Sequence, residues 1–376
     1  MIYFDNSATT NPKPHKVVFE AYNSLINYSY NSGRGGYPAT LSAAEKIYAV
    51  REKVAALVNA EPQCVVFTQN CTLSLNMAIK GAAKRGGHIL ISSLEHNAVL
   101  RPVCALEKSH GISFDAVPYF SDETQQAQAF EMMIKNNTCA IVSTMASNVF
   151  GCKMPIKAIG AVAAKHGIPF IVDGAQGAGV FDINMKRDNI SVLCCAGHKG
   201  LYGALALGFM AVRENVTLST IIEGGTGSLS ARYAQPDFLP DRFESGSLSN
   251  PLISALGAGI DFVTSYGIDR IYSDEMKLIR RLYGELEQTD KVNLYTPYPE
   301  YGKTAPILSF NLKDYPSEKT ADLLARENIA VRGGLHCAPL AHKSFDTLDT
   351  GTVRISPSVF TTKKDCDILI KTVKKL

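Results

Sequence analysis

The chain has 376 residues, of which 46% are hydrophobic and 19% charged, as is usual for a globular protein of about two domains. Its formal net charge of +3 is too small to favour a nucleic acid or an anionic membrane surface as a partner. No apolar run approaches the about 18 residues of a membrane span, and the first residues lack the basic start and apolar core of a signal peptide, so we expect a cytoplasmic protein.

The first elements are an arm, a loop and a helix. Residues 1–15 contain turn-forming residues and two prolines, which indicates an arm rather than a core element. A Gly-rich loop with a single arginine follows at 31–38. Apolar residues then recur near helical spacing from Leu41 to Val58, and this spacing predicts an amphipathic helix.

Short apolar runs alternate with helical stretches after this helix. The alternation predicts a mostly parallel sheet with helices on both faces. The predicted strands are Val65–Thr68, Ile89–Ser92, Ile112–Val117, Ala140–Thr144, Phe170–Val172, Val192–Cys195 and Leu207–Val212. We therefore expect an α/β fold whose large domain, residues 16–250, contains a mostly parallel seven-stranded sheet.

A smaller C-terminal domain is expected beyond residue 250. Asn250 can cap a helix whose first position is Pro251, and the chain keeps a helical pattern to about Gln288. This helix links the large domain to a smaller α/β domain made of residues 1–15 and 251–376. The small domain is predicted to contain strands at Ile307–Leu312, Ala330–Arg332 and Thr352–Ser356 and a closing helix from about Lys363.

Two of the buried strands end in a carboxylate and an amine. Asp173 follows one strand and Lys199 follows the next, with Gln176 in the Gly-rich turn after Asp173. In open α/β folds, ligands bind beyond the carboxyl ends of the strands. A lysine at this edge, with small neighbours and an acid one strand away, predicts a Schiff base with pyridoxal phosphate and an acid that pairs with its pyridinium nitrogen.

Further strand ends bring polar side chains to the same edge. Thr72 lies where the first strand passes into a helix, and free N–H groups there suit a phosphate, although a plain helix-capping threonine is the alternative. His96 follows the second strand and is placed to stack on a cofactor ring, although a lone histidine is more often structural. Asn148 follows the fourth strand. The convergence of several strand ends supports a cofactor site.

Two arginines of the small domain are candidate substrate ligands. Arg332 precedes two glycines, and Arg354 lies between Val353 and Ile355 in a strand-like run. Either is a surface charge or a ligand. An arginine directed into a cleft suits bidentate binding of a carboxylate, which an amino-acid substrate would supply.

The nine cysteines show neither a CxxC pair nor a Cys/His ligand spacing, so we expect no metal site and no disulfide framework. Most lie in apolar runs and are expected to be buried. Cys337 differs, because it lies in a Gly-rich loop beside His336, where exposure and an imidazole favour the thiolate. An idle loop cysteine is the alternative.

Six motifs run through essentially the whole chain: YFDNSATT, SLEHNAVLRP, VDGAQ, AGHKGLYG, RFESGS and RGGLHC. With them the chain resembles the class V aminotransferase family of pyridoxal-phosphate enzymes of fold-type I, specifically its cysteine desulfurases and selenocysteine lyases. VDGAQ followed by GHK at this separation is the most specific of these signals.

The resemblance implies a role for each matching residue. Lys199 would form the Schiff base, Asp173 would pair with the pyridinium nitrogen and His96 would stack on the ring. Gln176 would hydrogen-bond the phenolic oxygen of the cofactor. The phosphate would be held by Thr72 and His198 and by Ser247 from a partner subunit, because the family is typically homodimeric. The substrate carboxylate would be held by Asn148 and Arg354.

Two positions depart from the family pattern. Ala196 stands where relatives with SGHK place a serine on the phosphate, so one phosphate contact is missing. Val353 stands where one desulfurase branch places its nucleophilic cysteine, directly before the carboxylate-binding arginine. The other branch places that cysteine in the loop matching RGGLHC, where this chain has Cys337; however, the Arg- and His-containing form of this loop also occurs in the first branch, where its cysteine is not the nucleophile.

The resemblance implies removal of sulfur from L-cysteine, or of selenium from L-selenocysteine, to leave L-alanine. Lys199 would abstract the α-proton, Cys337 would take up the sulfur as a persulfide and His96 would protonate the product carbon. The released atom would pass to an acceptor, for which a protein partner is one candidate. The alternatives are another class V reaction, such as a cystine or cysteine β-lyase or an aminotransferase, and a catalytically idle protein that acts as a binding partner or sulfur carrier.

Overall fold

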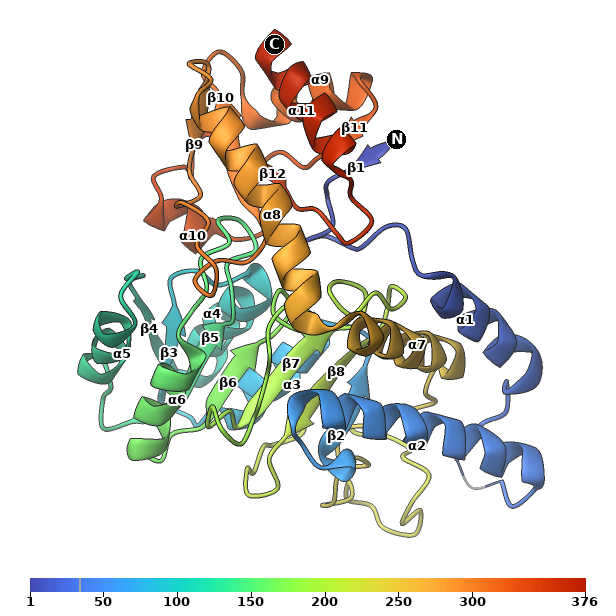
Figure 1. The fold of residues 1–376 in the computed structure, drawn as a ribbon. Helices are drawn as coiled ribbons and strands as arrows, with labels where there is room; N and C mark the ends of the chain where they lie inside the picture. Colours follow the sequence, from blue (N-terminus) through green and yellow to red (C-terminus); the bar gives the residue numbers. More distant parts are fainter. Residues whose placement is uncertain (34) are drawn as a thin grey trace.

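The computed structural model describes residues 1–33 and 35–376 (Figure 1). Arg34, the arginine of the predicted loop at 31–38, lies outside the described residues. The large part of the molecule is built on a seven-stranded sheet of order β2-β8-β7-β6-β5-β3-β4. Its strands are β2 (Val65–Thr68), β3 (His88–Ser92), β4 (Ser113–Val117), β5 (Thr138–Thr144), β6 (Phe170–Asp173), β7 (Val192–Ala196) and β8 (Gly208–Val212).

The expected mostly parallel α/β sheet is confirmed. β4, β3, β5, β6 and β7 pair in parallel, and only β8 is antiparallel, to both β7 and β2. Residues 192–196 of β7 and 170–173 of β6 are buried along their whole length. Because successive side chains point to opposite faces of a sheet, such apolar strands need cover on both sides.

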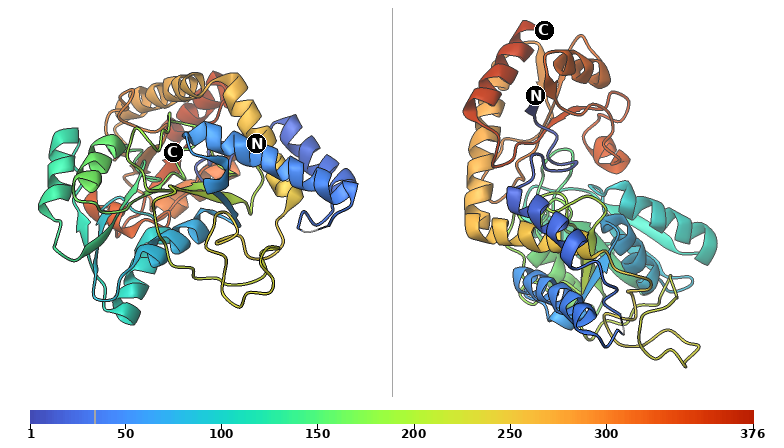
Figure 2. Two further views of the ribbon diagram at one scale, coloured as in Figure 1. Left: turned by 90° about the horizontal axis from the view of Figure 1, so that it is seen from below. Right: turned by 90° about the vertical axis from the view of Figure 1, so that its right-hand side faces the viewer.

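Helices cover the sheet on both faces (Figures 1 and 2). The core on one face includes residues of α3 and α4, and the core on the other includes residues of α2, α5, α6 and α7. The helices of this part are α1 (His15–Asn27), α2 (Pro38–Val58), α3 (Cys71–Ala82), α4 (Asn97–His110), α5 (Glu123–Met132) and α6 (Ile156–Lys165), with a 3-10 turn at Pro62–Cys64. The predicted amphipathic helix is α2, which begins earlier than expected, at Pro38.

The predicted linking helix is two helices, α7 (Asn250–Tyr266) and α8 (Ile268–Glu287), separated by Gly267. The prediction that Asn250 caps the helix is wrong, because Ser249 occupies the cap position and Asn250 is already helical. The side-chain Nδ2 of Asn250 instead donates to the main-chain carbonyls of Tyr28 and Tyr30, at 2.6 and 2.9 Å, and so holds α7 against the segment that follows α1. No single helix in the described ranges is long and apolar enough to cross a membrane; α7 and α8 pass that test only as a pair, which is bent by 78°.

The C-terminal part has its own small sheets and its own apolar core. An antiparallel sheet of order β12-β10-β9 consists of β9 (Val292–Leu294), β10 (Leu308–Leu312) and β12 (Val353–Ile355). β1 (Ile2–Tyr3) pairs in parallel with β11 (Ile329–Ala330), so the N-terminal arm belongs to this part (Figure 1). Its helices are α9 (Ser317–Arg326), α10 (Pro339–Ser344) and α11 (Lys363–Lys375). The division into domains at residue 250 stays a prediction.

Candidate active site

A cavity of about 100 Å³ lies beyond the carboxyl ends of the parallel strands. Seven side chains that the sequence singled out line it. They are Thr72, His96, Asn148, Asp173, Gln176, His198 and Lys199. They come from the last residue of β6, the turns after β3, β5, β6 and β7 and the start of α3, which is the convergence that a parallel sheet produces. Their chemical roles stay predictions.

The carboxylate and the amine share this cavity. Asp173, the last residue of β6, is only 3% exposed, and its Oδ1 accepts hydrogen bonds from the Ala175 amide at 2.9 Å and the Cys71 thiol at 3.5 Å. None of the described residues donates to its Oδ2. Burial lowers the pKa of Lys199, and the charge of Asp173 opposes that shift. The site thus contains the amine of Lys199, whose neutral fraction is increased, and the Oδ2 of Asp173, which can accept a hydrogen bond.

His96 is held in one orientation and one tautomer. It occupies the cap position of α4, where its Nδ1 accepts a hydrogen bond from the Ala98 amide at 3.0 Å. In the neutral ring the proton must therefore be on Nε2. Burial lowers the pKa of His96, with Lys199 and Arg354 acting in the same direction. The ring thus presents a neutral N–H group as a hydrogen-bond donor.

The N-terminal start of α3 and the side chain of His198 both line the cavity. The alternative in which Thr72 merely caps α3 is wrong, because Asn70 is the cap and accepts from the Leu73 amide at 2.9 Å. The Nδ1 of His198 is buried and has no hydrogen-bond partner in the described part of the chain. Burial and the charges of Lys199 and Lys13 lower the pKa of His198 to about 4. A helix N-terminus beside an unsatisfied imidazole nitrogen suits an anion.

The two candidate arginines differ in burial. The alternative in which Arg354 is a surface charge is wrong, since it is 3% exposed and its Nη1 donates to the main-chain carbonyl of Asn148 at 2.9 Å. The Arg332 side chain is 51% exposed. Both pair with Asp5, which sequence reasoning did not single out as a site residue. The only available signal was its place in the motif YFDNSATT.

Cys337 is the one exposed cysteine of the nine, all of which lie within the described residues. Two hydrogen bonds hold its loop: the Asn97 main-chain amide donates to the Cys337 carbonyl at 2.7 Å, and the Asn148 side chain donates to the His336 carbonyl at 2.8 Å. His336 and Cys337 have φ angles of 49° and 56°, a conformation that costs energy for such residues. The thiol is thus exposed on a loop with a defined backbone.

Ser247 is not brought to this cavity within one chain. It is exposed and lines a separate groove of about 560 Å³. Its predicted role in a partner's site is therefore untested in a single chain.

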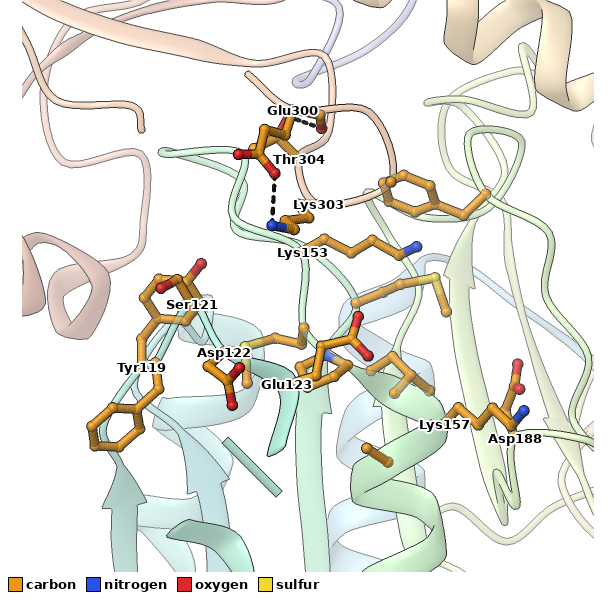
Figure 3. Close-up of a pocket in the computed structure, with 18 of the residues that line it drawn as sticks. Tyr119, Ser121, Asp122, Glu123, Lys153, Lys157, Asp188, Glu300, Lys303 and Thr304 are labelled. Carbon is orange, nitrogen blue, oxygen red and sulfur yellow. Dashed lines mark hydrogen bonds and ion pairs between the residues drawn. The ribbon is translucent and has the colours of Figure 1, made fainter. Parts of the chain in front are cut away.

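A larger cleft, of about 680 Å³, lies elsewhere and shares no residue with the candidate site (Figure 3). Its labelled side chains include the acids Asp122, Glu123 and Asp188 and the ion pair of Lys303 and Glu300, whose Nζ and Oε2 are 2.7 Å apart. Acids and bases are mixed along its walls, which favours no single ligand charge. We place the active site in the smaller cavity because it brings together an amine (Lys199), a carboxylate (Asp173) and an imidazole N–H donor (His96).

Glu95, the residue before His96 in the chain, is fully buried. Its Oε1 accepts hydrogen bonds from the Ser92 hydroxyl at 2.5 Å and the Thr144 amide at 2.6 Å, while Oε2 has no partner in the described part of the chain. Burial is the main cause that raises the pKa of Glu95, to about 8. Glu95 is therefore mostly protonated in the folded protein at neutral pH.

This pKa predicts a pH-dependent loss of stability. Between about pH 4.5 and 8 the unfolded chain has released the Glu95 proton and the folded chain retains it, so the free energy of unfolding falls as pH rises, by up to about 1.4 kcal/mol per pH unit. Glu95→Gln removes this contribution. We expect the melting temperature of the variant, relative to the unchanged protein, to rise between about pH 4.5 and 8 in thermal unfolding. The same substitution at the exposed Glu327 is the control, and a difference for Glu95→Gln that does not change with pH would contradict the assignment.

Comparison with known proteins shows the family of this chain. The family model described as aminotransferase class-V matches residues 2–369. A probable cysteine desulfurase of Methanothermobacter thermautotrophicus is 30% identical over all of this chain and 94% of its own length, and one from Synechocystis sp. is 27% identical over all of this chain and 90% of its own. The solved apo structure of a cysteine desulfurase from Thermococcus onnurineus superimposes with a TM-score of 0.91 at 28% identity, over all of this chain and 94% of that one.

Proposed function

Because this chain belongs to the class V aminotransferase family, we propose that it is a pyridoxal-phosphate enzyme that removes sulfur from L-cysteine and leaves L-alanine. The observation that carries the proposal is the convergence of Lys199, Asp173 and His96 in one cavity beside a loop with an exposed cysteine. The relatives named as cysteine desulfurases support the same substrate.

The cavity fits pyridoxal phosphate by its donor and acceptor groups. The unsatisfied Nδ1 of His198 and the start of α3 at Thr72 suit the phosphate, and the Oδ2 of Asp173 suits a protonated ring nitrogen. Ala196 lacks the hydroxyl that some relatives direct at the phosphate, so this chain relies on the remaining contacts. When bound, the cofactor supplies an electron sink that stabilises negative charge at the substrate Cα.

The chain's own residues then bind the substrate and move its protons. Arg354, with Asn148 beside it, holds the carboxylate, and the neutral amine of Lys199 takes the proton from Cα. Asp173 would hold the protonated ring nitrogen of the bound cofactor through its Oδ2. The Nε2–H of His96 is available to the carbon that loses sulfur.

The sulfur transfer requires a thiolate. The Cys337 thiolate attacks the substrate sulfur, so that an S–S bond forms, the C–S bond breaks, and its electron pair goes to the carbon that is then protonated. The products are L-alanine and a Cys337 persulfide. A thiol acceptor must then take up the outer sulfur and restore Cys337. We propose a protein acceptor in the cytoplasm, where an exposed cysteine stays reduced.

We also propose L-selenocysteine as a second substrate. The family resemblance puts the nucleophilic cysteine of one desulfurase branch where this chain has Val353, so a reaction that needs no protein thiol suits this chain. Since the C–Se bond is weaker, selenium can leave without a protein thiol.

Product analysis tests the proposed reaction. With L-cysteine and a thiol reductant, the cofactor-loaded protein is expected to release L-alanine and sulfide in equal amounts. Pyruvate with ammonia would instead indicate a β-lyase, and a new keto acid with an aminated cofactor would indicate an aminotransferase. No product and no cofactor uptake would favour the idle binding protein or sulfur carrier.

We also propose that the enzyme is a homodimer. α1 packs on α7 through Val17 and Ala21. Five large apolar side chains of α1 are each 59–61% exposed, namely Val18, Phe19, Tyr22, Leu25 and Ile26. Burying such a face against a second copy is favourable. A homodimer also accords with the resemblance, which implies that Ser247 binds the phosphate in the site of the partner subunit. A monomer in sedimentation velocity at micromolar concentration would argue against it.

A further inference from the structure

Arg354 is buried and only partly satisfied. Its Nη1 donates to the Asn148 carbonyl at 2.9 Å, and its Nη2 donates to Asp5 Oδ1 at 2.8 Å. Its Nε is buried and has no hydrogen-bond partner in the described part of the chain. A guanidinium group in this state retains donor capacity for one more acceptor. Its orientation depends on the two partners that it already has.

Asp5 connects two guanidinium groups. Its second oxygen, Oδ2, accepts from Arg332 Nε at 3.1 Å and from Arg332 Nη2 at 2.8 Å. The backbones of the two arginines also pair, with the Arg354 amide donating to the Arg332 carbonyl at 2.8 Å. Two positive charges and one negative charge are thus held together. The cluster has a net charge of about +1, which matches a single incoming carboxylate.

Main-chain hydrogen bonds on both sides of Asp5 fix its backbone and so restrict the position of its carboxylate. The Ser356 amide donates to the Phe4 carbonyl at 2.7 Å, and the Asn6 amide donates to the Ser356 carbonyl at 3.3 Å. The Asp5 side chain is only 13% exposed, which strengthens its interaction with Arg354.

The same N-terminal arm also contacts the cofactor end of the site. The Ser7 carbonyl accepts a hydrogen bond from the Gln176 amide at 3.0 Å. The His198 carbonyl accepts from the Thr10 hydroxyl at 3.2 Å and from Lys13 Nζ at 2.8 Å. One short segment therefore touches both the arginine pair and the turn that contains Lys199.

We propose that Asp5 is a positioning residue that orients Arg354 for the substrate carboxylate and thereby sets the preference for amino acids over simple amines. This inference rests on the proposed function and extends it to a residue that does not itself touch the substrate. Without the Asp5 charge, the hydrogen bond of Arg354 Nη2 would lose its charged acceptor, and Arg354 would face the Arg332 charge without compensation. The alternative is that Asp5 only ties the arm to the small sheets.

The test compares Asp5→Asn with the unchanged holoenzyme on two ligands, L-cysteine and cysteamine, which is cysteine without its carboxylate. We expect KM for L-cysteine to rise roughly tenfold or more while kcat stays within about threefold, since hydrogen bonds to charged groups are worth about 1.5–3 kcal/mol. The cofactor absorbance and the affinity for cysteamine, measured by spectral titration, are expected to stay unchanged. Asp367→Asn breaks an exposed ion pair with Arg281 elsewhere in the same part and serves as the matched control.

Three results would overturn the proposal: an unchanged KM, an equal loss for L-cysteine and cysteamine, or a loss in the Asp367→Asn control as large as in Asp5→Asn.

If Asp5→Asn does not fold, Asp5→Glu takes its place. It retains the charge but displaces the carboxylate by about 1 Å or more, and we expect the preference for L-cysteine to fall roughly tenfold. An unchanged preference would contradict the proposal. If the unchanged protein releases no alanine, the proposed function fails, but spectral titration of the holoenzyme with L-cysteine and with cysteamine still compares the two affinities and so tests the role of Asp5.

Discussion

Replacing Lys199 by alanine is expected to abolish turnover of L-cysteine, with a loss of roughly 10³-fold or more, and to remove the visible absorbance of the bound cofactor. The reason is that Lys199 has two proposed roles, to bond the cofactor aldehyde and to take the α-proton. Burial lowers the pKa of its ammonium group, so a larger fraction is the neutral amine that both tasks need. Among the described residues, it is the one lysine that lines the cavity.

Covalent trapping measures this directly. Borohydride treatment of the holoenzyme, followed by digestion and mass spectrometry, should place the cofactor mass on the peptide that contains Lys199. Lys153→Ala is a matched control, because burial also lowers the pKa of Lys153 but its side chain lies in the separate cleft of Figure 3. Label on any other lysine, or full activity of Lys199→Ala, would refute the assignment.

Replacing Cys337 by alanine is expected to lower the release of alanine from L-cysteine by on the order of 10²–10³-fold. The thiol is the exposed one among the cysteines, and its loop is hydrogen-bonded to Asn97 and Asn148 beside the cavity. The cofactor site lies on other elements, so the cofactor absorbance is expected to be unchanged. Turnover of L-selenocysteine should be reduced much less, because selenium can leave without the thiol.

The two substrates are compared for Cys337→Ala and for Cys104→Ala, which removes the half-buried cysteine of α4 as a control. After incubation with L-cysteine, mass spectrometry of the unchanged protein should show one added sulfur on the Cys337 peptide. Unchanged release of alanine from L-cysteine by Cys337→Ala would exclude Cys337 as the nucleophile.

The core strands of the large sheet were predictable from local pattern, whereas β1 and β9 were not. Val65–Thr68 is β2 with the expected bounds, and the predicted core strand at Phe170–Val172 is β6 with one residue added. β1 and β9 have two and three residues, too few to show a period of two, and each exists because a distant strand supplies its hydrogen bonds. The break between α7 and α8 at Gly267 was likewise missed, since the pattern is helical on both sides.

The sequence by itself determined the fold class and most of the candidate site. Buried parallel strands that end in polar residues have little choice of where to bring them, so Asp173, Lys199, His96 and Asn148 meet at one edge. Only the tertiary structure decided the pairing of Asp5 with Arg354, 349 positions away, and the attachment of the Cys337 loop to Asn148. Neither could be inferred from periodicity, because a contact between two loops depends on how the sheets pack and leaves no repeating pattern in either segment.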